Sequence, residues 1–239
     1  MESVKYILGK PEIDIEAGEI FPIKVKDYDE FNDCKNVLYI TKNHFSNEYQ
    51  EYPLLDLIVY GMKDVEMIRQ LKLLIKLVTG RDPLLREDDN GCSFIINSDK
   101  KVYSSNYESF RSIVMRQNLL FEQKVYKNKL TQEWANKAIE AKSKNGIPIT
   151  FEDMITTVSV ITGKTYDQIG EQTIYQLTAD FKRISRDKSY HTSIAMKCAG
   201  AEKVSIEHFA EEINMFENPY DSLFVGKDNL NHLNKAMKN

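Results

Sequence analysis

Residues 150–177 read TFEDMITTVSVITGKTYDQIGEQTIYQL, and this stretch contains three closely spaced signals for the start of a helix. Each signal is a threonine followed three residues later by Asp or Gln, in the pairs Thr150 with Asp153, Thr165 with Gln168, and Thr173 with Gln176. The threonine hydroxyl can accept a hydrogen bond from an unpaired N–H of the first turn, and the later side chain can bond back to the threonine N–H. The stretch therefore predicts short stacked helices, and none of its residues forms a recognisable catalytic pattern.

The residues that follow continue this pattern. We expect helices near residues 150–162, 165–170, 173–186, 191–199 and 205–215. Gly163 is placed to end the first of them, because glycine adopts the left-handed conformation that commonly follows a helix. Residues 147–225 thus predict a compact C-terminal helical bundle, and residues 226–239 predict a flexible polar tail.

The central residues, 53–146, predict helices around a β-hairpin. A short apolar helix over residues 54–60 is expected to end or bend at Gly61. Asp64 can cap a longer helix, and Gly80 with Pro83 supplies its stop signal. One face of this helix is an apolar stripe, formed by Val65, Ile68, Leu71, Ile75 and Val78. Apolar runs near residues 93–104 predict the hairpin, and residues 84–92 before it predict a charged, turn-rich connection.

Two further helices are expected in this central part. Ser105 with Glu108 forms another capping pair, which predicts a helix with Phe110 and Val114 on its apolar face. After a lysine-rich link over residues 122–130, a helix with Leu130, Trp134, Ala138 and Ala141 on one face stops near residues 145–148, where Asn, Gly and Pro occur. This stop is the expected domain boundary.

Residues 1–52 predict a small β-rich N-terminal part. Apolar side chains alternate over residues 4–8 and 13–15, and short apolar runs occur at residues 20–25 and 37–40. Pro22 cannot donate a hydrogen bond to a central ladder, so the strand there is expected at a sheet edge. The expected fold class is therefore α+β and predominantly helical.

Composition and charge restrict the classes of function. The chain has 239 residues, 42% of them hydrophobic and 28% charged, and its net charge of −4 gives no global attraction to nucleic acid or anionic membranes. Cys34, Cys92 and Cys198 lie far apart without a C-x-x-C pattern, which disfavours a disulfide framework and a zinc site. No apolar run approaches a signal peptide or the ~20 residues of a membrane span. We expect a protein of the cytoplasm that does not bind a membrane.

The sequence does not indicate a reaction centre. With Gly91 in the sixth position of a calcium loop, Arg86 and Asn97 fall where the loop needs acidic ligands. The four histidines include no pair at i, i+4, and the H-E-x-x-H, G-x-S-x-G, Walker A and G-x-G-x-x-G patterns are missing from the sequence. We therefore expect a non-enzymatic protein without a metal or cofactor. An enzyme assembled from distant residues is the last-ranked alternative.

Residues 165–186 also allow a helix-turn-helix interpretation. The C-terminal half of the second helix carries basic side chains, at Lys182, Arg183 and Arg186. Recognition helices contact bases near their N-terminus, however, where this chain has Ile174 and Tyr175. A DNA-binding regulator is therefore a secondary alternative, and nucleic acid is not the expected partner.

Three stretches carry a family resemblance: ITFEDM at 149–154, TIYQL at 173–177 and VSIEHFAEEI at 204–213. Here the chain resembles proteins encoded in the tail gene clusters of phages and prophages of Gram-positive bacteria. The resemblance covers the C-terminal third, and the remainder loosely. It implies a tail assembly chaperone that coats the tape measure protein before the tail tube polymerises. The implied partners are other phage tail proteins and further copies of the chain, in the cytoplasm of the bacterial host. A structural component of the tail or baseplate, and hence of the virion, is the first alternative.

Aromatic side chains near the ends of C-terminal elements are candidate partner-binding residues, because buried aromatic groups dominate many protein interfaces. These candidates are Tyr175, Phe181, Phe209, Phe216, Tyr220 and Phe224.

Overall fold

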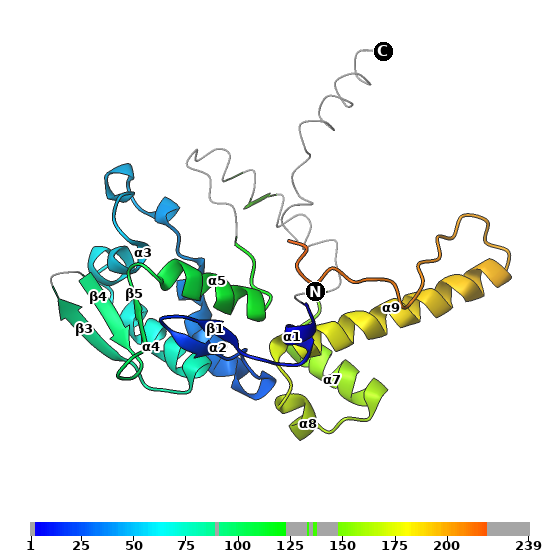
Figure 1. The fold of residues 1–239 in the computed structure, drawn as a ribbon. Coiled ribbons are helices and arrows are strands. Elements are labelled where there is room, and N and C mark those ends of the chain that lie inside the picture. The colour runs from blue at the N-terminus through cyan, green and yellow to red at the C-terminus, as the bar shows by residue number, and fades with distance from the viewer. Residues whose placement is uncertain (1–2, 89–90, 123–132, 134–135, 138–147, 219–239) are drawn as a thin grey trace, which may run out of the picture. The chain divides into compact units, whose positions relative to one another are not determined.

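A computed structural model describes residues 3–88, 91–122, 133, 136–137 and 148–218 (Figure 1). Residues 1–120 and 149–215 form one compact unit, and residues 121–148 with 216–239 form a second, of which few residues are described. The expected fold class is confirmed: the described chain is mixed α+β and mostly helical, with small antiparallel sheets. The division of the chain at residues 52 and 146 stays a prediction.

The N-terminal residues form more helix than expected. Their elements are α1 (Ser3–Ile7), β1 (Glu12–Asp14), β2 (Gly18–Ile20), η1 (Val25–Asp27), α2 (Tyr28–Cys34), η2 (Lys35–Tyr39), η3 (Lys42–His44) and η4 (Asn47–Tyr49). Strands β1 and β2 pair as an antiparallel hairpin, with Ile13 opposite Glu19. The hairpin agrees with the strand expected at residues 13–15.

The strands expected at residues 4–8, 20–25 and 37–40 need correction. Residues 4–8 lie mostly in helix α1, and only Tyr6 of the alternating apolar set is buried, against a distant part of the chain. Residues 37–40 lie mainly in the 3-10 helix η2, where neighbouring Val37 and Leu38 are both buried. A short apolar run does not separate strand from helix, and tertiary contacts decided both cases. Strand β2 ends at Ile20, so the run at 20–25 is strand only at its start.

The central helices follow their local signals. Helix α3 (Leu54–Asp56) continues into the π-helical turn η5 (Leu57–Gly61), and α4 runs over Val65–Thr79. The Asp64 side chain accepts a hydrogen bond from the Glu66 N–H at 2.9 Å, and Gly80 follows the helix with φ of 68°. Helix α5 covers Tyr107–Gln117. It does not start at the expected Ser105 cap: its N-cap is Asn106, whose side-chain oxygen accepts from the Tyr103 N–H.

A three-stranded antiparallel sheet lies between α4 and α5 in the sequence. Strands β3 (Leu84–Asp88), β4 (Gly91–Ile95) and β5 (Lys101–Tyr103) pair in the order β3-β4-β5. The expected hairpin is confirmed as β4 and β5. The turn-rich connection expected at 84–92 is wrong, since most of it forms β3 and the start of β4.

One large core joins these elements. Its fully buried members include Phe31 of α2, Leu55 of α3, Leu74 of α4, Phe94 of β4 and Phe110 of α5. Ile174, from the C-terminal part of the chain, belongs to the same cluster. The core thus extends to the start of the C-terminal helix at Ile174.

The C-terminal described residues form α7 (Phe151–Thr162), α8 (Tyr166–Gly170) and α9 (Ile174–Cys198). The break expected between residues 186 and 191 is wrong, because α9 contains no Gly or Pro and continues for 25 residues. The helix expected at 205–215 is also wrong, since these residues are irregular. The helix expected from Leu130 to Ala141 and the tail at 226–239 fall outside the described residues, apart from residues 133, 136 and 137.

Candidate partner-binding surface

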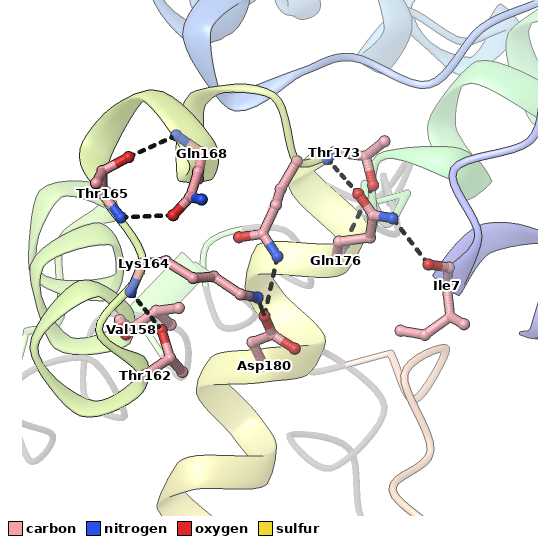
Figure 2. A network of polar contacts seen from close by, with 10 residues as sticks. Ile7, Val158, Thr162, Lys164, Thr165, Gln168, Thr173, Gln176 and Asp180 are labelled. Atoms are coloured by element: carbon pink, nitrogen blue, oxygen red, sulfur yellow. Dashed lines mark hydrogen bonds and ion pairs between the residues drawn. The ribbon is translucent and has the colours of Figure 1, made fainter.

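The three threonine caps all form as expected, and they set where α7, α8 and α9 begin. Figure 2 shows the caps at Thr165 and Thr173. The hydroxyls of Thr150, Thr165 and Thr173 accept hydrogen bonds from N–H groups three residues on, at 3.1, 3.3 and 3.1 Å. The third cap extends further, because the Gln176 side-chain amide also donates to the Ile7 carbonyl at 2.8 Å. The start of α9 is therefore bonded to the N-terminal residues.

A second, smaller core holds the three helices together. Val158 of α7, Ile169 of α8 and Leu177 of α9 are fully buried, and Val25 of η1 completes the cluster. Partly buried side chains pack around it, namely Phe151, Met154, Ile155, Phe181 and Ile184. All its α9 members lie in the first half of that helix, so this core stabilises only residues 174–184 of α9.

Polar and aromatic contacts attach these helices to the N-terminal part. The Ile174 N–H donates to the Ile23 carbonyl at 3.0 Å, and the Val25 N–H donates to the Gln172 carbonyl at 2.8 Å. Tyr28 stacks on Phe151 with a ring-centroid distance of 3.7 Å. These contacts connect residues more than 100 positions apart in the sequence.

Glu171 adds two ion pairs at the same junction. The Lys24 and Lys26 ammonium groups lie 2.7 and 2.6 Å from its two carboxylate oxygens. Their hydrogen bonds lower the pKa of Glu171 to about 2, so this carboxylate is charged throughout the physiological range. All three side chains are about half exposed, and solvent therefore weakens the pairs.

The second half of α9 has a different environment. We refer to residues 186–198 as the arm and to residues 204–215 as the strap, which runs back along α9 (Figure 1). The strap is held by two arginines. Arg183 Nη1 donates to the carbonyl oxygens of Phe209 and, at 2.9 Å, of Glu211. Arg186 Nη1 lies 2.8 Å from the Glu207 carboxylate.

Aromatic rings complete the contact between arm and strap. Tyr190 lies edge-on to His208 and to Phe209, with centroid distances of 5.3 and 5.5 Å. Large apolar side chains nevertheless stay exposed: Met196 of the arm is 53% exposed, and Ile206 and Phe209 of the strap are 37% and 40% exposed. Large apolar side chains exposed on neighbouring segments make the arm and strap a candidate protein-binding surface.

The structure separates the aromatic residues expected to bind a partner. Tyr175 is 2% exposed and packs on Tyr6, so its ring is not accessible in this conformation. Phe181 is partly buried in the smaller core, whereas Phe209 lies on the strap. Phe216 is partly exposed and assigned to the second unit. Tyr220 and Phe224 lie outside the described residues, and partner binding by this set stays a prediction.

Sequence reasoning missed three residues of the arm contact. The arginine-to-strap contacts could have been suspected from charge, because the basic run that includes Arg183 and Arg186 precedes a strap rich in glutamate, whereas no charge pattern indicates Tyr190. Separate helices at 191–199 and 205–215 would not place the glutamates beside these arginines, so the charge pattern was not used to predict the contact.

Side chains that could be reactive, such as the cysteines, are weaker candidates for a functional site. Asp56 accepts hydrogen bonds from Cys92 Sγ at 3.3 Å and from Ser104 Oγ at 2.8 Å. Burial, together with the bond to Asp56, raises the pKa of the Cys92 thiol, so it is neutral and a poor nucleophile. Burial likewise raises the pKa of Cys34 to about 12.

Two open hollows lie on the surface of the described chain. One, of about 600 Å³, is lined by the β1–β2 hairpin and residues such as Arg81 and Lys100. The other, of about 520 Å³, lies beside α8 and is lined by residues such as Ile155 and Tyr166. Among the described residues, His, Cys, Asp and Glu side chains form no group of three suited to a metal. No helix in the described ranges is long and apolar enough to cross a membrane.

The C-terminal helices are similar in sequence to a described protein family. Residues 140–214 match the family model described as YomV second domain. The chain is also 25% identical, over 219 residues, to the SPbeta prophage-derived uncharacterized protein YomV of Bacillus subtilis (strain 168), and the similarity covers 89% of each chain. No solved structure matches. These similarities support a prophage-derived origin for this chain.

The matched range contains all of α7, α8 and α9 and nearly all of the strap. It also overlaps the C-terminal part, residues 147–225, that was expected from the sequence. The second-domain model therefore covers the arm and strap together with the helices that support them.

Proposed function

We propose that this chain is a non-enzymatic prophage morphogenesis protein, and specifically a tail assembly chaperone that binds the tape measure protein. One observation carries the proposal: Met196 of the arm and Ile206 and Phe209 of the strap are exposed, and neither hydrophobic core includes them. The similarity to a prophage-derived relative supports the phage context. The bundle supplies a rigid base, and the arm supplies the contact surface.

The mechanism rests on shape and apolar burial rather than on bond chemistry. A tape measure protein is a long helical client, and many copies of a small chaperone can line it if each contributes one apolar surface. Each copy needs to bury only a modest area, because neighbouring copies on one client act together. Self-association of the chaperone along the client belongs to this proposal.

Co-expression tests the proposal directly. The chain carries an affinity tag and is expressed with the tape measure protein from the same gene cluster, and we expect a soluble complex that co-purifies. The test variant is Met196→Ser with Tyr190→Ser, two side chains of α9 itself, and it should reduce recovery of the client at least tenfold. Its matched control is Val160→Ser with Ile161→Ser, which changes two exposed apolar side chains of α7 outside the arm.

Two outcomes would contradict the proposal. Repeated failure of the wild-type chain to co-purify the client would remove the chaperone assignment. Equal recovery by the test and control variants would remove the arm as its binding surface. Mass spectrometry of purified particles separates the chaperone from the structural alternative, because a chaperone is depleted from the virion and a tail or baseplate component is retained.

The DNA-binding alternative has less support from the geometry. Arg183 and Arg186 are engaged with the strap, and the N-terminal residues of α9, Ile174 and Tyr175, are buried. A DNA-binding regulator would bind DNA with an affinity that falls steeply as salt concentration rises. The double variant Lys182→Ala with Arg186→Ala would also lower that affinity.

A further inference from the structure

The strap has a helical sequence but an irregular conformation. Its apolar residues Ile206, Phe209 and Ile213 recur at helical spacing, and the strong helix formers Ala and Glu lie between them. In the structure these residues form only short turns and bends. The helical preference of the strap's sequence therefore disagrees with the irregular backbone that the strap adopts.

The contacts with α9 explain how the irregular conformation is maintained. In an α-helix the Phe209 carbonyl would accept from the N–H four residues on, and the Glu211 carbonyl would do the same. Here the Arg183 guanidinium donates to both carbonyls. Arg186 meanwhile pairs with the Glu207 carboxylate and lies 3.8 Å from that of Glu211. If the arginine contacts were released, the Phe209 and Glu211 carbonyls could accept the hydrogen bonds of an α-helix.

The surface beneath the strap is basic and aromatic. Arg183, Arg186 and Tyr190 are spaced by three and four residues, which places them on one face of α9. The adjoining face of the arm is small or polar and exposed, as at Ser189 and Thr192. The face under the strap thus combines the positive charge and the aromatic ring that an acidic, apolar segment requires.

We propose that this face of α9 is the docking site for an acidic amphipathic helix of a partner protein, and that the strap is its displaceable intramolecular occupant. The strap indicates the chemistry of the partner: apolar side chains at i, i+3 and i+7, flanked by glutamates like Glu207 and Glu211, whose carboxylates lie near Arg186. The strap leaves its own Ile206 and Phe209 more than a third exposed, so it buries only part of its apolar area against this face. A helical partner can bury more apolar area there and satisfy its own backbone.

This inference deepens the proposed function, because it defines the client segment that the arm would recognise. It is tested without the client. The probe is a fluorescent peptide of sequence VSIEHFAEEINM, identical to residues 204–215. The receptor is the full chain with the strap weakened by Ile206→Ser and Phe209→Ser, both of which change exposed positions and leave the two cores intact.

Fluorescence anisotropy should show at least tenfold tighter peptide binding by the strap-weakened chain than by the wild type. Adding Arg186→Gln to the strap-weakened chain should weaken binding at least tenfold, and a peptide with lysine at each glutamate should not bind. Circular dichroism should show helix gained on binding. The control chain Val160→Ser with Ile161→Ser should bind no better than the wild type.

Equal affinity for the wild-type and strap-weakened chains would overturn the proposal, and so would affinity that Arg186→Gln leaves unchanged. Light scattering provides a further criterion: dimers formed by exchange of straps between wild-type copies would assign the face to a second copy and overturn a separate partner. If the peptide binds as expected while the tape measure protein fails to co-purify, the docking site stands and the client assignment falls.

Discussion

Thr173 offers the sharpest test of how the bundle is attached. Its hydroxyl accepts from the Gln176 N–H at 3.1 Å, its own N–H donates to Gln176 Oε1 at 2.8 Å, and the residue is buried. Thr173→Val keeps the branched shape and removes the hydroxyl, which should cost about 1 kcal/mol of unfolding free energy. Thr173→Ser keeps the hydroxyl and removes a buried methyl group, which should cost about 0.8 kcal/mol.

Thr173→Ala removes both contributions, so we expect a loss of about 2 kcal/mol, or roughly 4–8 °C in Tm for a protein of this size. Urea denaturation followed by circular dichroism at constant pH measures each free energy, with unchanged m-values as evidence that only stability changed. Thr165→Val is the matched control, because Thr165 has the same capping box but is exposed. We expect it to cost less than Thr173→Val.

The reasoning would be refuted by a specific pattern of losses. If Thr173→Val were neutral while Thr173→Ser cost as much as Thr173→Ala, the methyl group alone would matter and the cap would contribute nothing. If Thr165→Val cost more than Thr173→Val, burial of the cap would not strengthen it. Either result would separate the capping signal in the sequence from the stability of the bundle.

Three further outcomes follow from the described contacts. Because the pKa of Glu171 is lowered to about 2, its stabilising contribution is present above the unfolded value near 4.5 and is lost as pH falls toward 2. Urea midpoints of Glu171→Gln should therefore change less between pH 5 and pH 2.5 than those of the wild type. Cys198 is exposed, whereas Cys34 and Cys92 are buried, so a thiol reagent should modify one cysteine in the native protein and three after unfolding; rapid native modification of all three would contradict the described cores. Leu177→Ala should cost about 2–5 kcal/mol in urea denaturation, because Leu177 is fully buried in the smaller core, and a loss below 1 kcal/mol would show that this core collapses around the gap.

The helix ends were predictable because their signals are local. Asp64, Gly80 and the three threonine caps act within a few residues of themselves, and each is found where the sequence placed it. The N-terminal strands were not predictable in the same way. Tyr6 is buried by Tyr175, which lies 169 positions away, and no local pattern encodes that contact.

Strand β3 illustrates a second limit. Its residues include a charged run that resembles a turn, and the strand exists because Leu85 and Arg86 pair with Phe94 and Ser93 of β4. Pairing of this kind is set by the neighbouring strand rather than by the segment's own preference. The candidate surface shows the same limit, since the sequence drew attention to Phe209 but not to Tyr190 or to the role of Arg183.

The incorrect expectations differ in what the observed conformation gains. At α1 and η2 the chain departs from the expected strand and buries Tyr6, Val37 and Leu38, so tertiary packing accounts for the change. At the strap the chain departs from the expected helix and still leaves Ile206 and Phe209 exposed. Of the strap's apolar side chains only Met215 is buried, so folding alone gains little apolar burial from most of the strap's conformation. Disagreement between local preference and structure, without compensating burial, is expected where a segment is shaped for a partner, and in the described chain the strap meets both conditions.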